Sequence, residues 1–374
     1  MVRRILSGAS LALMLHLSVF AVSIGAQPAP SKSGEWDRIV EAARKEGKVV
    51  VSIPTSAELR KEFETGFKKA YPGIDLDLNV ARGASNINKI VEESNVGLRT
   101  IDLHIGGTTS IITGLLSREL LEPVQPWMIL PEVRDPKQWW GGHIWADNAK
   151  RFIYSFTAYL TETIWYNTTL VKTEDITSWD SLLEPKWKGN IVILDPRTPG
   201  SGESTWAFLL RIKGEPFLNK LAAQDMMVGR NLRQLAEQVA RGKSLVSIGV
   251  SYYTYVPFIK AGLPVKSISN IKEGYYAATG SGNLAIIKNA PHPNAAKVFV
   301  NWLLSAEGQN VFSRALGQPT RRLDVDTRWT KEFGHTPAKE ALTPEKFDAL
   351  ENGSEAVVAK YRKAAMHLAE KQFK

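Results

Sequence analysis

Two adjacent tyrosines, Tyr252 and Tyr253, are the residues in this chain best suited to hold a ligand. They directly follow the β-branched run 245–250, which predicts a buried strand. A phenolate is a hard oxygen donor, and a trivalent iron ion would lower the phenol pKa from about 10 by its direct charge. The pair therefore predicts ligand contacts and a candidate iron(III) site. The structural alternative is packing plus a surface hydrogen bond, and Tyr275-Tyr276 forms a second such pair.

The loop 198–205, which reads Thr-Pro-Gly-Ser-Gly-Glu-Ser-Thr, predicts an anion site. The N–H groups in the first turn of a helix lack intrahelical partners and lie at the positive end of the helix dipole. Ser201 and Gly202 are therefore candidate anion contacts. Two observations leave this open, because a serine here could simply cap the helix and because Glu203 already places a carboxylate in the same turn.

Hydroxyl groups also follow two strands in the first half of the chain. Thr55 and Ser56 come after the valine-rich run 49–53, and Thr108 and Thr109 follow the run 101–105. Ligands of open α/β sheets bind beyond the carboxyl ends of the strands, so we expect these residues to form one wall of a cleft. Arg82, just after the second predicted strand (74–80), is either a counter-charge for an anion or a surface residue.

Strands alternate with helices throughout, which predicts an α/β fold. Buried or half-buried strands are expected at 49–53, 74–80, 101–105, 190–195, 245–250, 265–268 and 283–288. Helices are expected at 58–71, 84–98, 204–213 and 231–240, and 252–260 would be helical apart from Pro257. Between the two halves, 123–148 is irregular and rich in proline and tryptophan, and 152–166 is extended enough to cross from one half to the other.

The first 26 residues predict a secretory signal peptide. Arg3 and Arg4 precede an apolar run, and the small residues up to Ala26 suit cleavage there, although a permanent N-terminal anchor is the alternative. The chain of 374 residues has no cysteine, which excludes a disulfide framework and the thiol of a lipoprotein anchor. We therefore expect a free periplasmic protein large enough for two lobes.

Charge and motifs narrow the function further. The net charge is +9, but the basic residues are dispersed, with pairs such as Arg321-Arg322 and no block of five or six, so nucleic-acid binding is not expected. The chain has no Gly-x-Ser-x-Gly or His-Glu-x-x-His motif, and no phosphate-binding loop of the form Gly-x-x-x-x-Gly-Lys-Ser/Thr. Nothing thus argues for an enzyme, although a secreted enzyme on a two-lobed scaffold remains the alternative.

Several segments together resemble the extracellular solute-binding proteins of bacterial ABC importers, in the branch of the ferric-ion-binding proteins. They are 36–51, Trp165-Tyr166-Asn167-Thr168, 187–191 and above all 283–309. The resemblance implies a two-lobed periplasmic binding protein of type II, with mixed central sheets and a hinge. It implies 27–155 and 283–325 in lobe 1, and 156–282 and 326–374 in lobe 2. It also implies a monomer that delivers its solute to a membrane permease.

The resemblance also assigns site residues. In the ferric branch a tyrosine pair ligates iron and a Ser-Gly helix start holds a partnering anion, which maps onto Tyr252-Tyr253 and Ser201-Gly202. The branch usually adds a histidine after the first strand and a carboxylate after the third, but this chain has hydroxyl residues at both places. Two solutes therefore stay open: iron(III) with an anion, or an organic anion bound by hydroxyl and amide donors.

Overall fold

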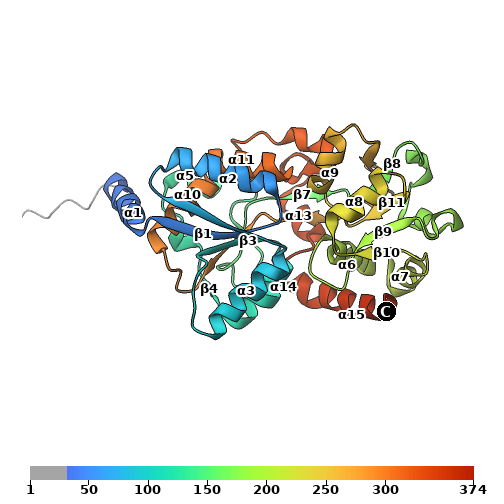
Figure 1. Ribbon diagram of the computed structural model, residues 1–374, viewed down its shortest axis with the longest axis horizontal. Coiled ribbons are helices and arrows are strands. Elements are labelled where there is room, and N and C mark those ends of the chain that lie inside the picture. The colour runs from blue at the N-terminus through green and yellow to red at the C-terminus, as the bar shows by residue number, and fades with distance from the viewer. Residues whose placement is uncertain (1–31) are drawn as a thin grey trace, which may run out of the picture.

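The computed structural model describes residues 32–374, which form two lobes lying side by side (Figure 1). The predicted signal peptide lies outside the described residues. The blue, cyan and orange parts of the chain build lobe 1, and the green and yellow parts build most of lobe 2. Each lobe has its own mixed sheet with helices on both faces, which confirms the predicted α/β fold and the mixed sheets that the resemblance implies.

The sheet of lobe 1 has seven strands, in the order β2-β1-β3-β14-β6-β5, with β4 paired to β14. The strands β1, β2 and β3 are parallel, and β14 returns antiparallel to β3 after the chain has visited lobe 2. Their bounds are β1 (Lys48–Ile53), β2 (Asp75–Val80), β3 (Leu103–Gly106), β4 (Leu121–Glu122), β5 (Ile144–Trp145), β6 (Tyr154–Ser155) and β14 (Asn283–Ile287). The carboxyl ends of β1, β2 and β3 therefore meet at one edge, which faces lobe 2.

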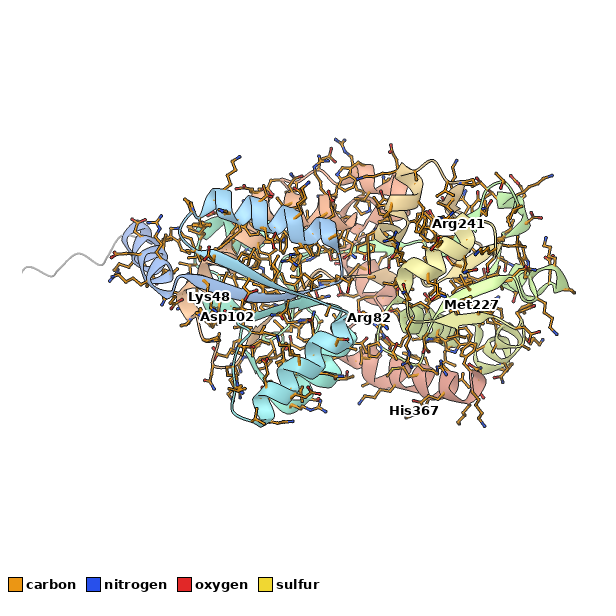
Figure 2. The ribbon with its side chains drawn as sticks, viewed as in Figure 1. Lys48, Arg82, Asp102, Met227, Arg241 and His367 are labelled. Carbon is orange, nitrogen blue, oxygen red and sulfur yellow. The ribbon has the colours of Figure 1, made fainter. Side chains whose placement is uncertain are left out.

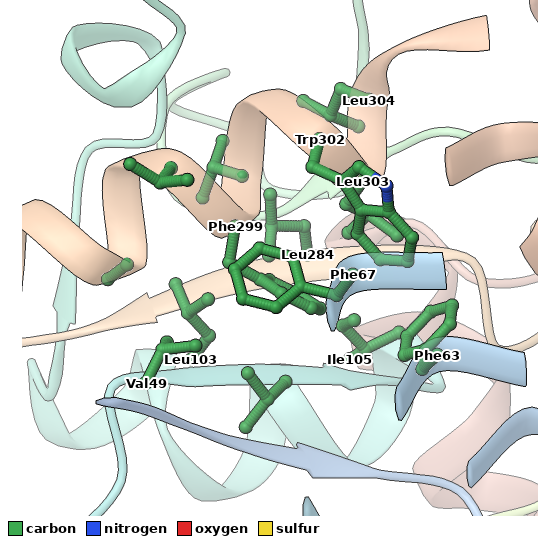
Figure 3. Close-up of a cluster of buried hydrophobic side chains, with 14 of the residues drawn as sticks. Val49, Phe63, Phe67, Leu103, Ile105, Leu284, Phe299, Trp302, Leu303 and Leu304 are labelled. Carbon is green, nitrogen blue, oxygen red and sulfur yellow. The ribbon is translucent and has the colours of Figure 1, made fainter. Parts of the chain in front are cut away.

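Helices cover both faces of this sheet. They are α1 (Lys32–Glu46), α2 (Ala57–Ala70), α3 (Gly83–Asn95), α4 (Thr108–Gly114), α5 (Pro131–Arg134), α10 (Pro293–Leu304) and α11 (Ala306–Leu316). On one face, aromatic side chains of α2 and α10 interlock over the strands (Figure 3). The Phe63 and Trp302 ring centroids lie 5.5 Å apart, and those of Phe67 and Phe299 5.4 Å. Residues of β1 and β3 pack in the same core.

The sheet of lobe 2 has five strands, in the order β10-β9-β11-β8-β12. The bounds are β8 (Ile164–Asn167), β9 (Ile191–Leu194), β10 (Met227–Gly229), β11 (Val246–Ile248) and β12 (Val265–Ser267). Helices α6 (Ser201–Lys213), α7 (Glu215–Ala222), α8 (Leu232–Ala240), α9 (Tyr252–Lys260) and α15 (Lys363–Gln372) cover it. Because β9, β10 and β11 are parallel, α6 and α9 begin at the same sheet edge.

A third, small sheet joins the lobes in the order β13-β7-β15. Its strands are β7 (Tyr159–Thr161), β13 (Ala277–Ala278) and β15 (His335–Pro337). The first two belong to the segments that cross between the main sheets, so this sheet forms the floor between the lobes.

The C-terminal part contacts both lobes, whereas the resemblance implies that 326–374 belongs to lobe 2. It contains α12 (Ala338–Ala341), α13 (Pro344–Leu350), α14 (Glu355–Val357) and the π-helical turn η8 (Val358–Arg362). In lobe 1, the Glu355 N–H donates to the Ala146 carbonyl oxygen at 2.7 Å, and Val358 packs in a core cluster with Ile111. In lobe 2, α15 lies along α6. The division of the chain into lobes stays a prediction.

Two local expectations differ from the structure. The helix α6 starts at Ser201, three residues before the predicted start, so the Ser-Gly pair lies inside its first turn. The helix α9 continues through Pro257, although a proline removes one backbone hydrogen bond. Its aromatic side chains are anchored in the lobe 2 core, which offsets that loss. Among the described residues, no helix has the length and apolarity needed to cross a membrane.

Candidate ligand-binding site

A cavity of about 180 Å³ lies between the lobes, at the carboxyl ends of the parallel strands of both sheets. Lobe 1 lines it with residues that follow β1, β2 and β3, and lobe 2 with residues that follow β9 and β11. The small joining sheet supplies the floor, and the C-terminal segment one side. Of the predicted site residues, the lining includes Thr55, Arg82, Thr108, Thr109, Ser201 and Tyr253. Ser56, Gly202 and Tyr252 are not part of it.

The wall from lobe 1 is built from threonine side chains and backbone. Thr108 and Thr109 open the helix α4 and are only 4 % and 2 % exposed. The Thr109 hydroxyl is buried without a hydrogen-bond partner among the described residues. Ser56 instead caps α2, because its Oγ accepts a hydrogen bond from the Leu59 N–H at 3.1 Å. Its hydroxyl therefore serves the helix and does not face the cavity.

Arg82 reaches from lobe 1 to lobe 2. It stands at the start of α3, and its Nη2 donates a long hydrogen bond of 3.4 Å to Thr198 Oγ1 in the loop after β9. Figure 2 shows Arg82 at the junction of the lobes. Among residues 32–374, no carboxylate forms a salt bridge with its guanidinium. Arg82 therefore brings an uncompensated positive charge to the cavity.

The two predicted tyrosines separate at the start of α9. Tyr253 lines the cavity and packs against the hydrophobic core of lobe 1. Tyr252 is buried in lobe 2, with its ring stacked 6.1 Å from that of Trp165. Burial raises the pKa of Tyr252 to about 12. Burial also raises the pKa of Tyr253, and the nearby Arg82 opposes that rise. Of the predicted pair, only Tyr253 therefore lines the cavity in this structure.

Two further phenols, which the sequence did not predict at this site, also line the cavity. Tyr159 comes from β7, and Tyr276 lies just before β13. Burial raises the pKa of each, and Tyr276 and Tyr253 raise that of Tyr159 further, because neighbouring phenolates repel. The second tyrosine pair was visible in the sequence, but nothing local marked Tyr276 as the member that faces the cavity.

The helix start of α6 forms the wall from lobe 2. Ser201 lines the cavity, and its hydroxyl donates to the Gly249 carbonyl oxygen at 2.5 Å, so its free donor is the backbone N–H. Gly202 packs against the end of β9, where an added Cβ would lie 2.0 Å from the Leu194 carbonyl oxygen. Only a glycine lets α6 start this close to the strand.

Glu203, the carboxylate in this turn, points away from solvent and is neutralised. Arg362 from the C-terminal segment binds both of its carboxylate oxygens through one edge of the guanidinium, with Nε at 2.6 Å from Oε1 and Nη2 on Oε2. The two side chains are 0 % and 6 % exposed. Sequence reasoning missed Arg362, and no local pattern could have revealed a partner 159 residues away.

The lining has the character of an anion site. Among the described residues that line the cavity, none is Asp, Glu or His, and the charged ones are Arg82 and Arg362. The described residues also contain no group of three or more His, Cys, Asp or Glu placed to hold a metal ion. Hydroxyls, phenols, helix N–H groups and one unpaired guanidinium are donors that suit a carboxylate or a phosphate.

Solved structures of two proteins share the fold of this chain. Iron-bound HitA from Pseudomonas aeruginosa matches with a TM-score of 0.63 at 19 % identity, covering 87 % of this chain and 99 % of HitA. The periplasmic binding protein AfuA from Actinobacillus pleuropneumoniae, with fructose-6-phosphate bound, matches with a TM-score of 0.64 at 21 % identity, covering 87 % and 98 %.

Sequence comparison identifies the family. Iron uptake protein A2 from Synechocystis is 27 % identical over 177 residues, 43 % of this chain and 50 % of that protein. The matches to curated relatives span half or less of those relatives' own length. Residues 52–310, more than half of the chain, match the family description of bacterial extracellular solute-binding proteins. The chain therefore belongs to the bacterial extracellular solute-binding protein family.

Proposed function

We propose that this protein is the periplasmic solute-binding component of an ABC importer, and that it captures a small organic anion between its lobes. The observation that carries the proposal is Arg82, a guanidinium without a carboxylate partner among the described residues, in a cavity whose described lining has no acidic side chain. Engineered cavities of ~150 Å³ hold benzene, so the space suits a small metabolite.

The binding mode follows from the two walls. The Arg82 guanidinium and the N–H groups at the start of α6 bind a carboxylate or phosphate, and the threonines of lobe 1 bind the remaining oxygens. A solute that touches both lobes favours the closed form, which a permease in the inner membrane recognises. The predicted signal peptide supports a periplasmic location, and we propose that the protein acts as a monomer.

Iron(III) is the second candidate, and the three phenols that line the cavity favour it. Tyr159, Tyr253 and Tyr276 would be the ligands, in place of the predicted pair. Burial disfavours their deprotonation, so the ion's own charge would have to supply the phenolates. Both kinds of cargo occur among proteins of this fold, since HitA is iron-bound and AfuA holds fructose-6-phosphate. We favour the organic anion because it would pair with Arg82 directly, whereas iron(III) would need its partnering anion to offset the charge of this guanidinium.

An enzyme on the same scaffold is the third alternative. General acid–base chemistry needs a positioned proton donor and acceptor, and the described lining offers phenols and hydroxyls without a carboxylate or imidazole. This composition supports capture of a solute over its conversion.

Calorimetric titration of the stripped mature protein tests the proposal. Citrate, glycerol 3-phosphate and inorganic phosphate are titrated separately, and ferric chloride is added in a parallel visible-absorption titration. We expect 1:1 binding of at least one anion without a phenolate-to-iron absorption band. No binding of any anion, with a band that Tyr253→Phe removes and Tyr252→Phe leaves intact, would replace the anion by iron(III).

A further inference from the structure

The buried ion pair between Glu203 and Arg362 joins the anion wall of the cavity to the C-terminal segment. Glu203 lies in the first turn of α6, where a carboxylate interacts favourably with the helix dipole. Arg362 lines the cavity and also donates to Ser204 Oγ at 2.6 Å and to the Asn352 carbonyl oxygen at 2.9 Å. The same arginine therefore contacts the carboxylate, the helix start and the C-terminal segment.

Stability alone is a weak reason for such a pair. Replacing a buried ion pair with packed apolar residues is often neutral or stabilising, because both charges lose their hydration. Here the pair stands beside the space where an anion is expected. If a neutral side chain replaced Arg362, Glu203 would put an uncompensated negative charge at that helix start and repel an anion. If a neutral side chain replaced Glu203, Arg362 would add a second uncompensated positive charge to the cavity.

We propose that Arg362 is a positioning residue for solute capture, which cancels the charge of Glu203 and so keeps the start of α6 open to an anion. The inference rests on the proposed function, because it assumes that the solute is an anion. It makes the C-terminal segment part of the site. That segment also contacts the opposite wall, because an added Cβ on Gly353 would lie 2.6 Å from Thr108 Oγ1.

A charge cycle on the two residues tests this proposal. Glu203→Gln, Arg362→Gln and the double variant are titrated with citrate, glycerol 3-phosphate and inorganic phosphate, after circular dichroism has checked their fold. Arg362→Gln should weaken anion binding about tenfold or more, and Glu203→Gln should strengthen it about threefold or more. The double variant should return to within about threefold of the wild type, because neither charge remains.

The chain provides a matched control in the same lobe. Asp195 is 1 % exposed and bonds Arg197 through Oδ1 at 2.8 Å, but neither residue lines the cavity. Asp195→Asn removes a buried carboxylate of the same kind and should leave anion affinity unchanged. A change equal to that of Glu203→Gln would mean that the effect is general to the lobe, which would overturn the proposal.

The outcomes separate the inference from the proposed function. If the wild type binds no anion, the proposed function fails and the inference fails with it. If the wild type binds an anion but both single variants weaken it alike, the pair is only structural and the inference is wrong. If Arg362→Gln does not fold, Glu203→Gln and the double variant still test the inference. Glu203→Gln must bind the anion more tightly than the wild type, and the double variant must lose that gain.

Discussion

The Arg82 guanidinium and the Thr198 hydroxyl meet across the cleft, 3.4 Å apart, although they belong to different lobes. Arg82 follows β2 in lobe 1, and Thr198 lies in the loop that leads into α6 in lobe 2. The bond is long, and a threonine hydroxyl compensates little of a full positive charge. An anionic solute would therefore be a stronger partner for Arg82 than Thr198 is. If Arg82 exchanged Thr198 for the solute as its partner, solute binding would be coupled to the relative position of the lobes.

Replacing Arg82 should weaken anion binding without unfolding the protein. A hydrogen bond to a charged group contributes about 1.5–3 kcal/mol, so Arg82→Gln should lower affinity by roughly 10- to 100-fold. Arg82 is half-buried with one weak protein contact, so the melting temperature should change little. Calorimetry and a thermal melt measure both effects, with the exposed Lys89→Gln of the same helix as control. An unchanged affinity in Arg82→Gln would remove this residue from the site.

The two adjacent tyrosines should behave differently. Tyr253→Phe removes a phenol that lines the cavity and should weaken solute binding, by about 0.5–1.5 kcal/mol if one neutral hydrogen bond is lost. Tyr252→Phe alters a side chain in the lobe 2 core and should change stability more than affinity. Parallel titrations and denaturant melts of the two variants test this. Equal losses of affinity would show that both phenols contact the solute.

The aromatic core of lobe 1 should dominate the stability of that lobe. Phe299 is fully buried between Phe63 and Phe67, so Phe299→Ala should cost about 3–5 kcal/mol of unfolding free energy. Leu98, which is 55 % exposed, is the control, and Leu98→Ala should stay within about 0.5 kcal/mol. Urea denaturation measures both, and a cost below 1 kcal/mol for Phe299→Ala would contradict the packing described.

Two buried histidines should make the fold sensitive to acid. Burial lowers the pKa of His104 and that of His335 from 6.5 to about 4, because the charged imidazolium loses its hydration. The unfolded chain binds these protons more readily than the folded one between about pH 6.5 and 4. Stability should therefore be complete above that window and fall through it on acidification, by on the order of 3 kcal/mol per histidine.

Denaturation at pH 7 and pH 4.5 measures this loss. His104→Gln should reduce the difference between the two pH values, whereas the exposed His367→Gln, on the outer surface of lobe 2 in Figure 2, should leave it unchanged. An equal difference in all three proteins would mean that His104 does not contribute to the acid sensitivity.

The sequence predicted the main strands of both sheets and the edge where the cavity lies, because buried runs such as 49–53 and 190–195 are typical of parallel strands. It could not choose between neighbouring residues. Successive side chains on a helix point about 100° apart, so which of the two phenols lines the cavity depends on where α9 begins and how it docks. Ser56 caps α2, so of the adjacent pair Thr55 and Ser56 only Thr55 lines the cavity.

The residues that sequence reasoning missed come from tertiary packing. Tyr159 and Tyr276 reach the cavity because the crossing strands form its floor, and Arg362 does so because the C-terminal segment runs between the lobes. No periodicity or local motif encodes such contacts, since they depend on how distant elements dock. From the sequence alone, the carboxylate of Glu203 argues against an anion site at this helix start. Only the structure shows that Arg362 pairs with it.

Native mass spectrometry of the protein as isolated from the periplasm tests the central claim most directly. The solute that leaves the complex on gentle activation is identified by its mass and charge, with Arg82→Gln purified in parallel. We predict a single organic anion, bound 1:1 in the wild type and depleted in the variant. A bound iron ion without an organic anion, or a neutral or cationic solute, would contradict the account.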